Sequence, residues 1–419
     1  MRSLSAALFA GVIAGAFVWS VSAVASAKYQ ENVVWSFGAL PDGQVPRGTL
    51  IEVNGKLYGT TGNGGANRGG TVFSLDPSTG VETVLHSFCA PGCIGDGEEP
   101  DAGLIDVDGT LYGTTTAGGA YGGGAIFSFD PDSGAEAIVH SFCSEAQCAD
   151  GAAPRVALVD VKGVLYGTTT EGGPKCRYEA GFICGTVFSF DPKTGVEKLV
   201  HSFDKFADGT RPGTSLVYWK GALYGTTYTG GGIRCDGDGP KYGCGVLYSI
   251  DPKSGVETVL YEFCSQPYCV DGFAAYSSLI NINGVFYGTT STGGGSSQQS
   301  DLGTLYSYDP NSGAVKVVYS FCSKERCADG SNPYGNLIDV KGKLYGTTSV
   351  GGDANRGTVF SFDPNTGVEK ALYSFQSGHD GNMPSAGLTD VGGTFYGTTL
   401  YGNAHSDNGT NGTIFSLTK

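Results

Sequence analysis

The sequence predicts an all-β protein, a seven-bladed β-propeller whose blades are four-stranded antiparallel sheets. One observation is a tetrapeptide, Tyr-Gly-Thr-Thr, that recurs at intervals of 51 to 63 residues, starting at Tyr58, Tyr112, Tyr166, Tyr224, Tyr287, Tyr345 and Tyr396. The other is that each repeat contains four runs rich in β-branched and aromatic residues, which favour strands. A four-stranded unit repeated about every 40–50 residues is typical of propeller blades, and longer loops account for the longer period here.

The second repeat shows how each blade is expected to form. Asp108-Gly109 joins its first two runs, and this dipeptide favours tight hairpins because glycine accepts a positive φ. Asp130-Pro-Asp-Ser-Gly134 joins the last two runs, with proline presetting the turn. No sustained helical periodicity occurs after residue 27. The expected strands are Leu104–Val107, Thr110–Thr115, Ala125–Asp130 and Glu136–Phe142.

The tetrapeptide is expected to hold neighbouring blades together. Its glycine leaves a gap on one strand face, into which we expect the adjacent blade to pack. Its threonine hydroxyls are expected to bond the neighbouring Asp-Gly turn, so their role would be in stability and not in activity.

The two ends of the repeat array predict a closed ring. Glu31–Phe37 resembles the fourth strand of other repeats, whereas the last repeat stops after its third strand, Thr413–Leu417. We therefore expect the N-terminal strand to complete the last blade, which gives seven whole blades with no strand left over. The alternatives are an open β-solenoid and two packed sheets, but neither explains why one unit is split between the chain ends.

The N-terminus predicts export from the cytoplasm. Met1–Ala27 contains one charge, Arg2, then an apolar stretch and a small-residue motif, Ala25-Ser-Ala27, which is typical of a cleaved secretory signal peptide. The alternative is an N-terminal membrane anchor. We expect residues 28–419 to be the propeller domain, secreted or periplasmic and without membrane insertion, because no second long apolar span follows.

Charge narrows the class of partner. The formal net charge is −15, which becomes −16 without Arg2, so the chain should repel nucleic acids and anionic membranes. The expected partner is a glycan or a protein, with no nucleic acid. The protein is expected to be a monomer.

Twelve cysteines fall into six close pairs, which in an exported chain predict six disulfides. Each would close a short loop and stiffen it, with a limited gain in global stability. Zinc is the alternative, but the spacing is not C-x₂-C and the loops contain no histidine, so no metal site is expected. The pairs are Cys89 and Cys93, Cys143 and Cys148, Cys176 and Cys184, Cys235 and Cys244, Cys264 and Cys269, and Cys322 and Cys327.

Strand polarity predicts two unequal ends of the ring. Short turns between strands one and two, and between three and four, share one end, the turn end. Long connections share the other, the loop end, which carries all twelve cysteines and where we expect binding. The longest loops, in the third and fourth repeats, combine cations and aromatics that suit a glycan or anionic ligand, unless they only pack on themselves. The candidate residues are Lys175, Arg177, Tyr178, Tyr228, Arg234 and Tyr242.

Recurring carboxylates could form calcium sites. A calcium loop usually supplies several oxygens, whereas each Asp-Gly pair here supplies one, so a turn whose Asp accepts backbone N–H bonds is favoured. These are Asp42, Asp96, Asp150, Asp208, Asp271, Asp329 and Asp380. Five acids in the first strands, expected to line the channel, either hold a cation or are solvated: Glu52, Asp106, Asp160, Asp339 and Asp390. We expect no cofactor.

The sequence assigns no catalytic residue. His86, His140 and His201 occupy a position that is tryptophan or tyrosine in other repeats, so a packing role is favoured over catalysis or metal binding. The chain contains no G-x-S-x-G or H-E-x-x-H motif and no phosphate-binding glycine loop.

The complete repeat unit resembles the GloVer-type tandem repeat of exported bacterial proteins. Its pattern is Leu-Tyr-Gly-Thr-Thr-x-x-Gly-Gly, then Gly-Thr-Val-Phe-Ser-x-Asp-Pro-x-Thr-Gly, a strand ending in Ser-Phe, and Asp-Gly-x-x-Pro. The resemblance covers Glu31–Lys419 and implies an exported bacterial propeller, although the C-terminal anchors frequent in that family have no counterpart here. It transfers no catalytic residues.

The expected function is that of a secreted binding or interaction module for a glycan or protein, acting through the loop end. The alternative is a polysaccharide lyase or hydrolase with its site in the funnel of the same end. Such an enzyme needs a paired acid and base, and the fold alone does not supply that assignment.

Overall fold

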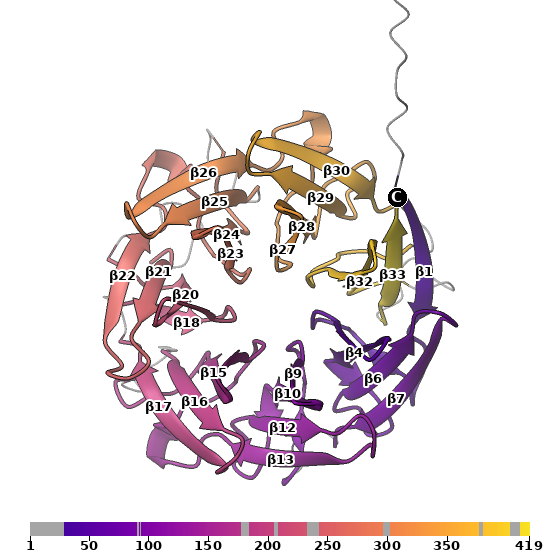
Figure 1. Cartoon of the computed structure of the whole chain (residues 1–419), viewed down its shortest axis with the longest axis vertical. Coiled ribbons are helices and arrows are strands. Elements are labelled where there is room, and N and C mark those ends of the chain that lie inside the picture. Colours follow the sequence, from indigo (N-terminus) through magenta and orange to yellow (C-terminus); the bar gives the residue numbers. More distant parts are fainter. Residues whose placement is uncertain are drawn as a thin grey trace, which may run out of the picture.

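The protein is a closed ring of seven sheets around a central channel (Figure 1). A computed structural model describes residues 29–419 except 90–91, 93, 177–183, 205–207, 233–242, 296–301, 377–379 and 403–410. The seven-bladed all-β prediction is confirmed, and the described residues contain only three helical turns. The predicted signal peptide, Met1–Ala27, lies outside the described residues.

The two inner strands of each blade follow the repeat closely. The first strands, nearest the channel, are β3 (Ile51–Val53), β9 (Ile105–Val107), β14 (Val159–Val161), β19 (Val217–Trp219), β23 (Ile280–Ile282), β27 (Ile338–Val340) and β31 (Thr389–Val391). The second strands, which carry Tyr-Gly-Thr-Thr, are β4 (Lys56–Thr61), β10 (Thr110–Thr115), β15 (Val164–Thr169), β20 (Ala222–Thr229), β24 (Val285–Thr290), β28 (Lys343–Thr348) and β32 (Thr394–Thr399).

The outer half of each blade is equally regular. The third strands are β6 (Thr71–Asp76), β12 (Ala125–Phe129), β16 (Thr186–Asp191), β21 (Val246–Ile250), β25 (Thr304–Asp309), β29 (Thr358–Asp363) and β33 (Thr413–Thr418). The outermost strands are β7 (Val81–Ser87), β13 (Glu136–Ser141), β17 (Val196–Ser202), β22 (Glu257–Glu262), β26 (Ala314–Ser320), β30 (Val368–Ser374) and β1 (Gln30–Ser36).

Short elements decorate the connections of the loop end. They are β2 (Gly43–Gln44), β5 (Asn63–Gly64), β8 (Gly97–Glu98), β11 (Ala117–Gly118) and β18 (Thr210–Pro212), with the 3₁₀ turns η1 (Ala146–Cys148), η2 (Pro267–Cys269) and η3 (Glu325–Cys327).

The strand nearest the N-terminus occupies the outer position of the sheet built by the end of the chain. β1 pairs antiparallel with β33, with Val33 opposite Phe415 (Figure 1). The sheet order is β1-β33-β32-β31. The seventh blade therefore joins two segments more than 340 residues apart in sequence.

The apolar core lies between neighbouring blades. The phenylalanine that follows each outer strand is buried and packs, edge-on or tilted, against an aromatic ring in the third strand of the next blade. Ring centroids are 4.9–5.3 Å apart in the pairs 37–73, 88–127, 142–188, 203–248, 263–306, 321–360 and 375–415. Because Phe37 and Phe73 make the same contact as the other pairs, the junction after β1 packs like the rest of the ring.

The glycine of the tetrapeptide makes room within its own blade. A Cβ atom on Gly59 would lie 2.6 Å from Phe73 and from Leu50, both buried side chains of the same blade. The expectation that the adjacent blade fills this gap is therefore wrong. The Phe73 ring, on the third strand, needs this space because the edge of the ring lies against Gly59 on the second strand of the same blade.

The first threonine of the tetrapeptide does join neighbouring blades. Thr60 Oγ1 donates to the carbonyl of Ala102 at 2.7 Å, and Thr398 donates to the carbonyl of Pro46 at 3.3 Å across the ring closure. The acceptor lies a few residues beyond the Asp-Gly turn and not in the turn itself, which corrects the expected partner. Four further blades repeat the bond, through Thr114, Thr168, Thr289 and Thr347.

Replacing Thr60 with valine should destabilise the ring. Valine keeps the shape of the side chain but leaves the buried Ala102 carbonyl without its donor, at a cost of about 1–2 kcal/mol. Thermal unfolding of Thr60→Val should show a lower Tm, whereas Thr83→Val, at an exposed position of β7, should leave Tm unchanged. Equal Tm values for Thr60→Val and the unmodified protein would show that the bond does not stabilise the blade junction.

The recurrent acids are structural in the described residues. Asp106 Oδ1 accepts the amide of Gly109 at 2.8 Å, and the other four first-strand acids cap the same hairpin turn. The Asp of each Asp-Gly pair accepts backbone amides, as predicted; Asp42, for example, accepts those of Gly38 and Gly43. Each set therefore stabilises a turn.

Candidate functional site: the mouth of the central channel

A cavity of about 670 Å³ opens at the loop end of the channel. A second cavity, of about 270 Å³, shares part of its lining and extends toward the first strands. The shared lining consists of one residue from each blade, which we call the channel ring: Arg47, Asp101, Arg155, Gly213, Tyr276, Tyr334 and Ser385.

The repeat explains why these residues meet. Each follows the proline that comes four residues after the Asp of the Asp-Gly turn, or follows Ala275 in the fifth blade. The residue before that proline, or before Ala275 in the fifth blade, has a positive φ in every blade, between 53° and 58°, which turns the chain inward before the first strand. The seven-fold scaffold therefore brings one variable side chain per blade to the same mouth.

A charged group occupies the half of the ring formed by the first three blades. Asp101 Oδ2 lies 3.2 Å from an Arg47 nitrogen and 3.6 Å from an Arg155 nitrogen. The Asp101 side chain is only 10% exposed, whereas those of Arg47 and Arg155 are 47% and 44% exposed. Burial raises the pKa of the Asp101 carboxyl, and the two guanidiniums oppose that shift. Both arginines therefore keep N–H donors free to face the cavity.

Tyrosines line another side of the larger cavity, and two of them, Tyr276 and Tyr334, belong to the channel ring. The Tyr276 ring lies 4.6 Å from Tyr228 and 4.9 Å from Tyr334, measured between ring centroids, with interplanar angles of 35° and 48°. Burial raises the pKa of the Tyr276 hydroxyl, and Tyr228 adds to the shift. The three rings come from the fourth, fifth and sixth blades and form a continuous aromatic row of half-buried side chains.

Only part of the candidate site expected from the sequence lies in the described residues. Tyr228 lines the cavity. Lys175 does not line it, and its backbone amide donates to Ser202 at 3.3 Å. Arg177, Tyr178, Arg234 and Tyr242 lie outside the described residues.

Sequence reasoning missed the channel ring, although a signal was present. The Asp-Gly-x-x-Pro motif predicts a turn, and the signal lies in the residue that follows its proline. That position holds Arg, Asp, Arg, Gly, Tyr, Tyr and Ser, a chemical variety unlike the constant residues around it. Variation at one position of an otherwise regular repeat is expected where a scaffold presents a binding surface.

Four of the predicted disulfides are confirmed: Cys143–Cys148, Cys176–Cys184, Cys264–Cys269 and Cys322–Cys327. Cys89 and Cys244 are also disulfide-bonded, while their predicted partners, Cys93 and Cys235, lie outside the described residues. These bonds are typical of a protein that folds in an oxidising compartment outside the cytosol.

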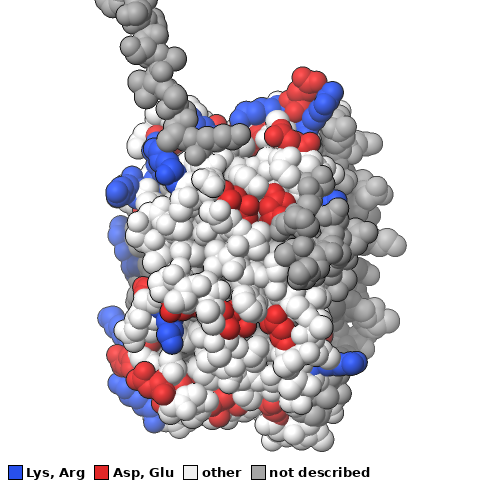
Figure 2. Space-filling model, turned by 90° about the vertical axis from the view of Figure 1, so that its right-hand side faces the viewer, with Lys and Arg blue, Asp and Glu red and all other residues white. Residues whose placement is uncertain are grey.

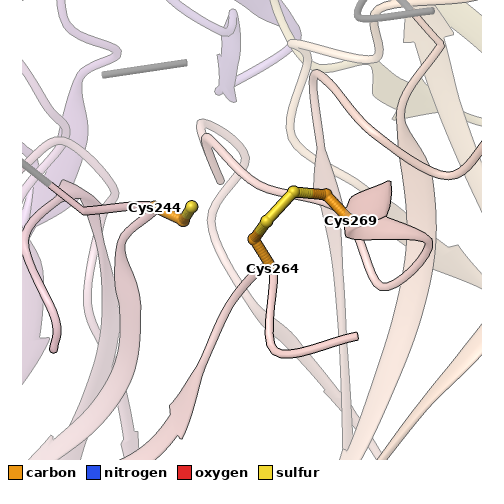
Figure 3. A group of neighbouring side chains, drawn as sticks. All are labelled: Cys244, Cys264 and Cys269. Carbon is orange, nitrogen blue, oxygen red and sulfur yellow. A yellow bond between two sulfur atoms is a disulfide. The ribbon is translucent and has the colours of Figure 1, made fainter. Parts of the chain in front are cut away.

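Cys244 lies beside the Cys264–Cys269 disulfide, at the junction of the fourth and fifth blades (Figure 3). Three neighbouring sulfur atoms resemble a zinc site in composition. All three belong to disulfides, however, and zinc binds thiolates, so this group is not a metal site in the oxidised protein.

Charged side chains are spread over the described part of the outer wall that Figure 2 shows. On the side visible in Figure 2, the charged side chains lie in small separate groups with uncharged surface between them. In the described part of the chain, no helix is long and apolar enough to cross a membrane.

Fold and site together define a repeat β-propeller with a variable ring of side chains at the mouth of its channel. The chain belongs to the Gloeobacter/Verrucomicrobia repeat family, which it matches over residues 18–237 and 235–419. No curated protein matches it.

Several solved structures share the fold. An oligogalacturonate lyase from Vibrio parahaemolyticus is 9% identical, with a TM-score of 0.56 and coverage of 94% of both chains. An oligogalacturonate lyase in complex with manganese is 12% identical, with a TM-score of 0.53 and coverage of 93% and 96%. The extracellular domain of a putative one-component system from B. thetaiotaomicron is 12% identical, with a TM-score of 0.55; the match covers 94% of this chain and 40% of that one. Identities this low show likeness of fold alone.

Proposed function

We propose that the protein is an exported carbohydrate-binding module whose site is the cavity at the channel mouth. The row of Tyr228, Tyr276 and Tyr334 is the observation that carries the proposal. Aromatic rings that line one wall of a cavity provide flat apolar surfaces at low conformational cost, and these suit the apolar faces of sugar rings. The charged half of the ring supplies fixed hydrogen-bond donors for hydroxyl and carboxylate groups.

The lining charge favours an acidic oligosaccharide. The described lining holds three arginines, Arg47, Arg155 and Arg211, against two carboxylates, Asp101 and Glu171, on a chain whose formal net charge is −15. A carboxylate-bearing sugar would pair with guanidinium groups that Asp101 only partly occupies. The attraction between these opposite charges is stronger at a partly enclosed mouth than on the open surface.

A glycan array containing neutral and uronic-acid oligosaccharides, followed by calorimetry, tests this function. We expect binding of acidic oligosaccharides that Arg155→Ala weakens about tenfold, with a smaller effect on neutral ones. Arg326→Ala, at a 90% exposed position of η3 on the same end, serves as the control and should change nothing. Absence of glycan binding, or equal losses in the two variants, would count against the proposal.

A polysaccharide lyase is the second candidate, supported by the likeness to oligogalacturonate lyases of similar length. Its chemistry needs a base and an acid near the bound sugar. Among the described lining residues only Asp101 and Glu171 carry carboxylates, and Asp101 is engaged by two arginines. A reducing-end assay on every oligosaccharide that binds separates the two: unchanged sugars support the binding module, and new reducing ends support the enzyme.

A further inference from the structure

The junctions between blades contain a second recurring group of polar side chains. At each junction, a side chain near the end of the outer strand meets the Asp of the Asp-Gly turn. In three blades this side chain is a tyrosine whose hydroxyl donates to the Asp at 2.6–2.7 Å, in the pairs Tyr261–Asp271, Tyr319–Asp329 and Tyr373–Asp380. At these three junctions the tyrosine hydroxyl therefore supplies the hydrogen bond that the aspartate accepts.

The junction between the third and fourth blades differs because it carries a histidine. The Nδ1 atom of His201 lies 3.0 Å from the carbonyl oxygen of Gly255. A carbonyl can only accept, so Nδ1 carries a proton and donates it. In the neutral ring the other nitrogen, Nε2, then presents a lone pair.

Two carboxylates lie near that nitrogen. Nε2 of His201 lies 3.5 Å from Asp208 Oδ2 and 3.7 Å from Glu257 Oε2, which comes from the next blade. The side chains of His201 and Glu257 are each only 7% exposed, and that of Asp208 is 14% exposed. Within the described residues, neither His201 Nε2 nor Glu257 Oε1 has a hydrogen-bond partner. Buried acceptors that face one another are costly unless a proton or a cation lies between them.

We propose that His201, Asp208 and Glu257 bind one divalent transition-metal ion of the zinc class at this junction. A tetrahedral zinc with bonds of about 2.0–2.2 Å holds its donor atoms about 3.3–3.6 Å apart, close to the separations found here. All three donor atoms lie within 4.8 Å of one another. The Nδ1–H bond to a backbone carbonyl is the arrangement that commonly orients a metal-binding histidine. This proposal does not depend on the proposed function of the channel mouth.

The junctions of His86 and His140 can be compared with that of His201 in their distances to carboxylates and in their burial. His86 Nε2 lies 3.7 Å from Asp96 and 3.9 Å from Glu136, but these three side chains are 24%, 26% and 11% exposed. The junction of His140 forms no such three-membered group among the described residues. His140 is therefore a matched control for His201.

Zinc titration tests the proposal. The full-length protein, stripped with EDTA and returned to chelator-free buffer, is titrated with ZnCl₂ by calorimetry, with Tm measured at each ratio. Tyrosine is the natural occupant of this position at three junctions, so His201→Tyr should fold. We expect His201→Tyr to lose one equivalent of bound zinc and the associated rise in Tm, and His140→Tyr to lose neither.

A second variant, Glu257→Gln, tests the same site even if His201→Tyr does not fold. Glu257→Gln retains the shape of the side chain and should weaken zinc binding at the same site at least about tenfold. Loss of one equivalent in His201→Tyr or its weakening in Glu257→Gln, with His140→Tyr unaffected, supports the site. No zinc binding by the unmodified protein, or the same stoichiometry and affinity in all the proteins, overturns it.

Discussion

Tyr276→Ala should reduce affinity for an oligosaccharide at the channel mouth by at least about tenfold. Tyr276 is the middle ring of the aromatic row and contacts both Tyr228 and Tyr334, so its loss removes the central stacking surface. An aromatic contact of this kind contributes about 0.5–1.5 kcal/mol beyond the area that it buries, and the lost area adds to this. Calorimetry on the oligosaccharide identified by the array measures the change.

Two further variants show whether the loss reflects the site. Tyr276→Phe keeps the ring and should retain most of the affinity. Tyr121→Ala removes a 59% exposed tyrosine from a loop of the same end, outside the cavity lining, and should bind normally. If Tyr276→Ala binds as tightly as Tyr121→Ala, the aromatic row does not form the binding surface.

Stability should fall as the pH rises from 5.5 to 8.5. Burial, with help from a neighbouring aspartate, raises the pKa of Glu31 to about 7, of Glu82 to about 8 and of Glu197 to about 7. One oxygen of each of these carboxyls is buried without a hydrogen-bond partner in the described structure. Each glutamate comes from one blade and faces the Asp-Gly aspartate of the preceding blade, so these junctions hold two acids each.

The sign of the effect follows from proton linkage. Each folded-state pKa lies above the unfolded value of 4.5, so between these values the folded protein binds more protons than the unfolded chain. The stabilisation is complete below about pH 4.5 and is lost as the pH passes the folded-state values. Because the groups are partly solvated, each contributes about 1 kcal/mol of stability, and the loss of these contributions lowers Tm on the order of 5 °C over this range.

Glu82→Gln provides the matched variant for this effect. The amide has the shape of the acid but cannot ionise, so it should raise Tm at pH 8.5 and flatten the pH dependence, with little change at pH 5.5. The scans are run in EDTA so that metal binding does not contribute. A Tm that is constant or rises toward pH 8.5, or a variant that is no more stable than the unmodified protein there, contradicts this account.

The architecture was accessible from the sequence because propeller blades are built from local signals. Hairpin dipeptides, the Asp-Pro turn and strand composition each act within a few residues. The repeat unit, which the tetrapeptide marks, presents these signals seven times. The expected strand Glu136–Phe142 corresponds to β13, Glu136–Ser141. The role of Gly59 was not accessible in the same way, because it depends on which ring, that of Phe73, lies across the sheet.

The site was less accessible because it depends on where the ends of different blades converge. The tyrosines and cations of the long loops predicted a binding site there. Among those candidates that lie in the described residues, Tyr228 lines the cavity and Lys175 does not. Arg155 and Tyr276 have no distinctive local motif in the sequence, and they line the same cavity because each follows a turn with positive φ at the channel mouth. In the same way, His201 matched a packing position in sequence, while its two carboxylate neighbours come from a turn and from the next blade.

The most direct test of the channel-mouth site is a crystal structure of the protein with the oligosaccharide selected by the array. We expect a sugar ring stacked on Tyr276, with its polar groups hydrogen-bonded to Arg155 or Arg47 at the mouth of the channel. A sugar bound on the outer wall or at the turn end, with the cavity at the channel mouth holding only solvent, would contradict it.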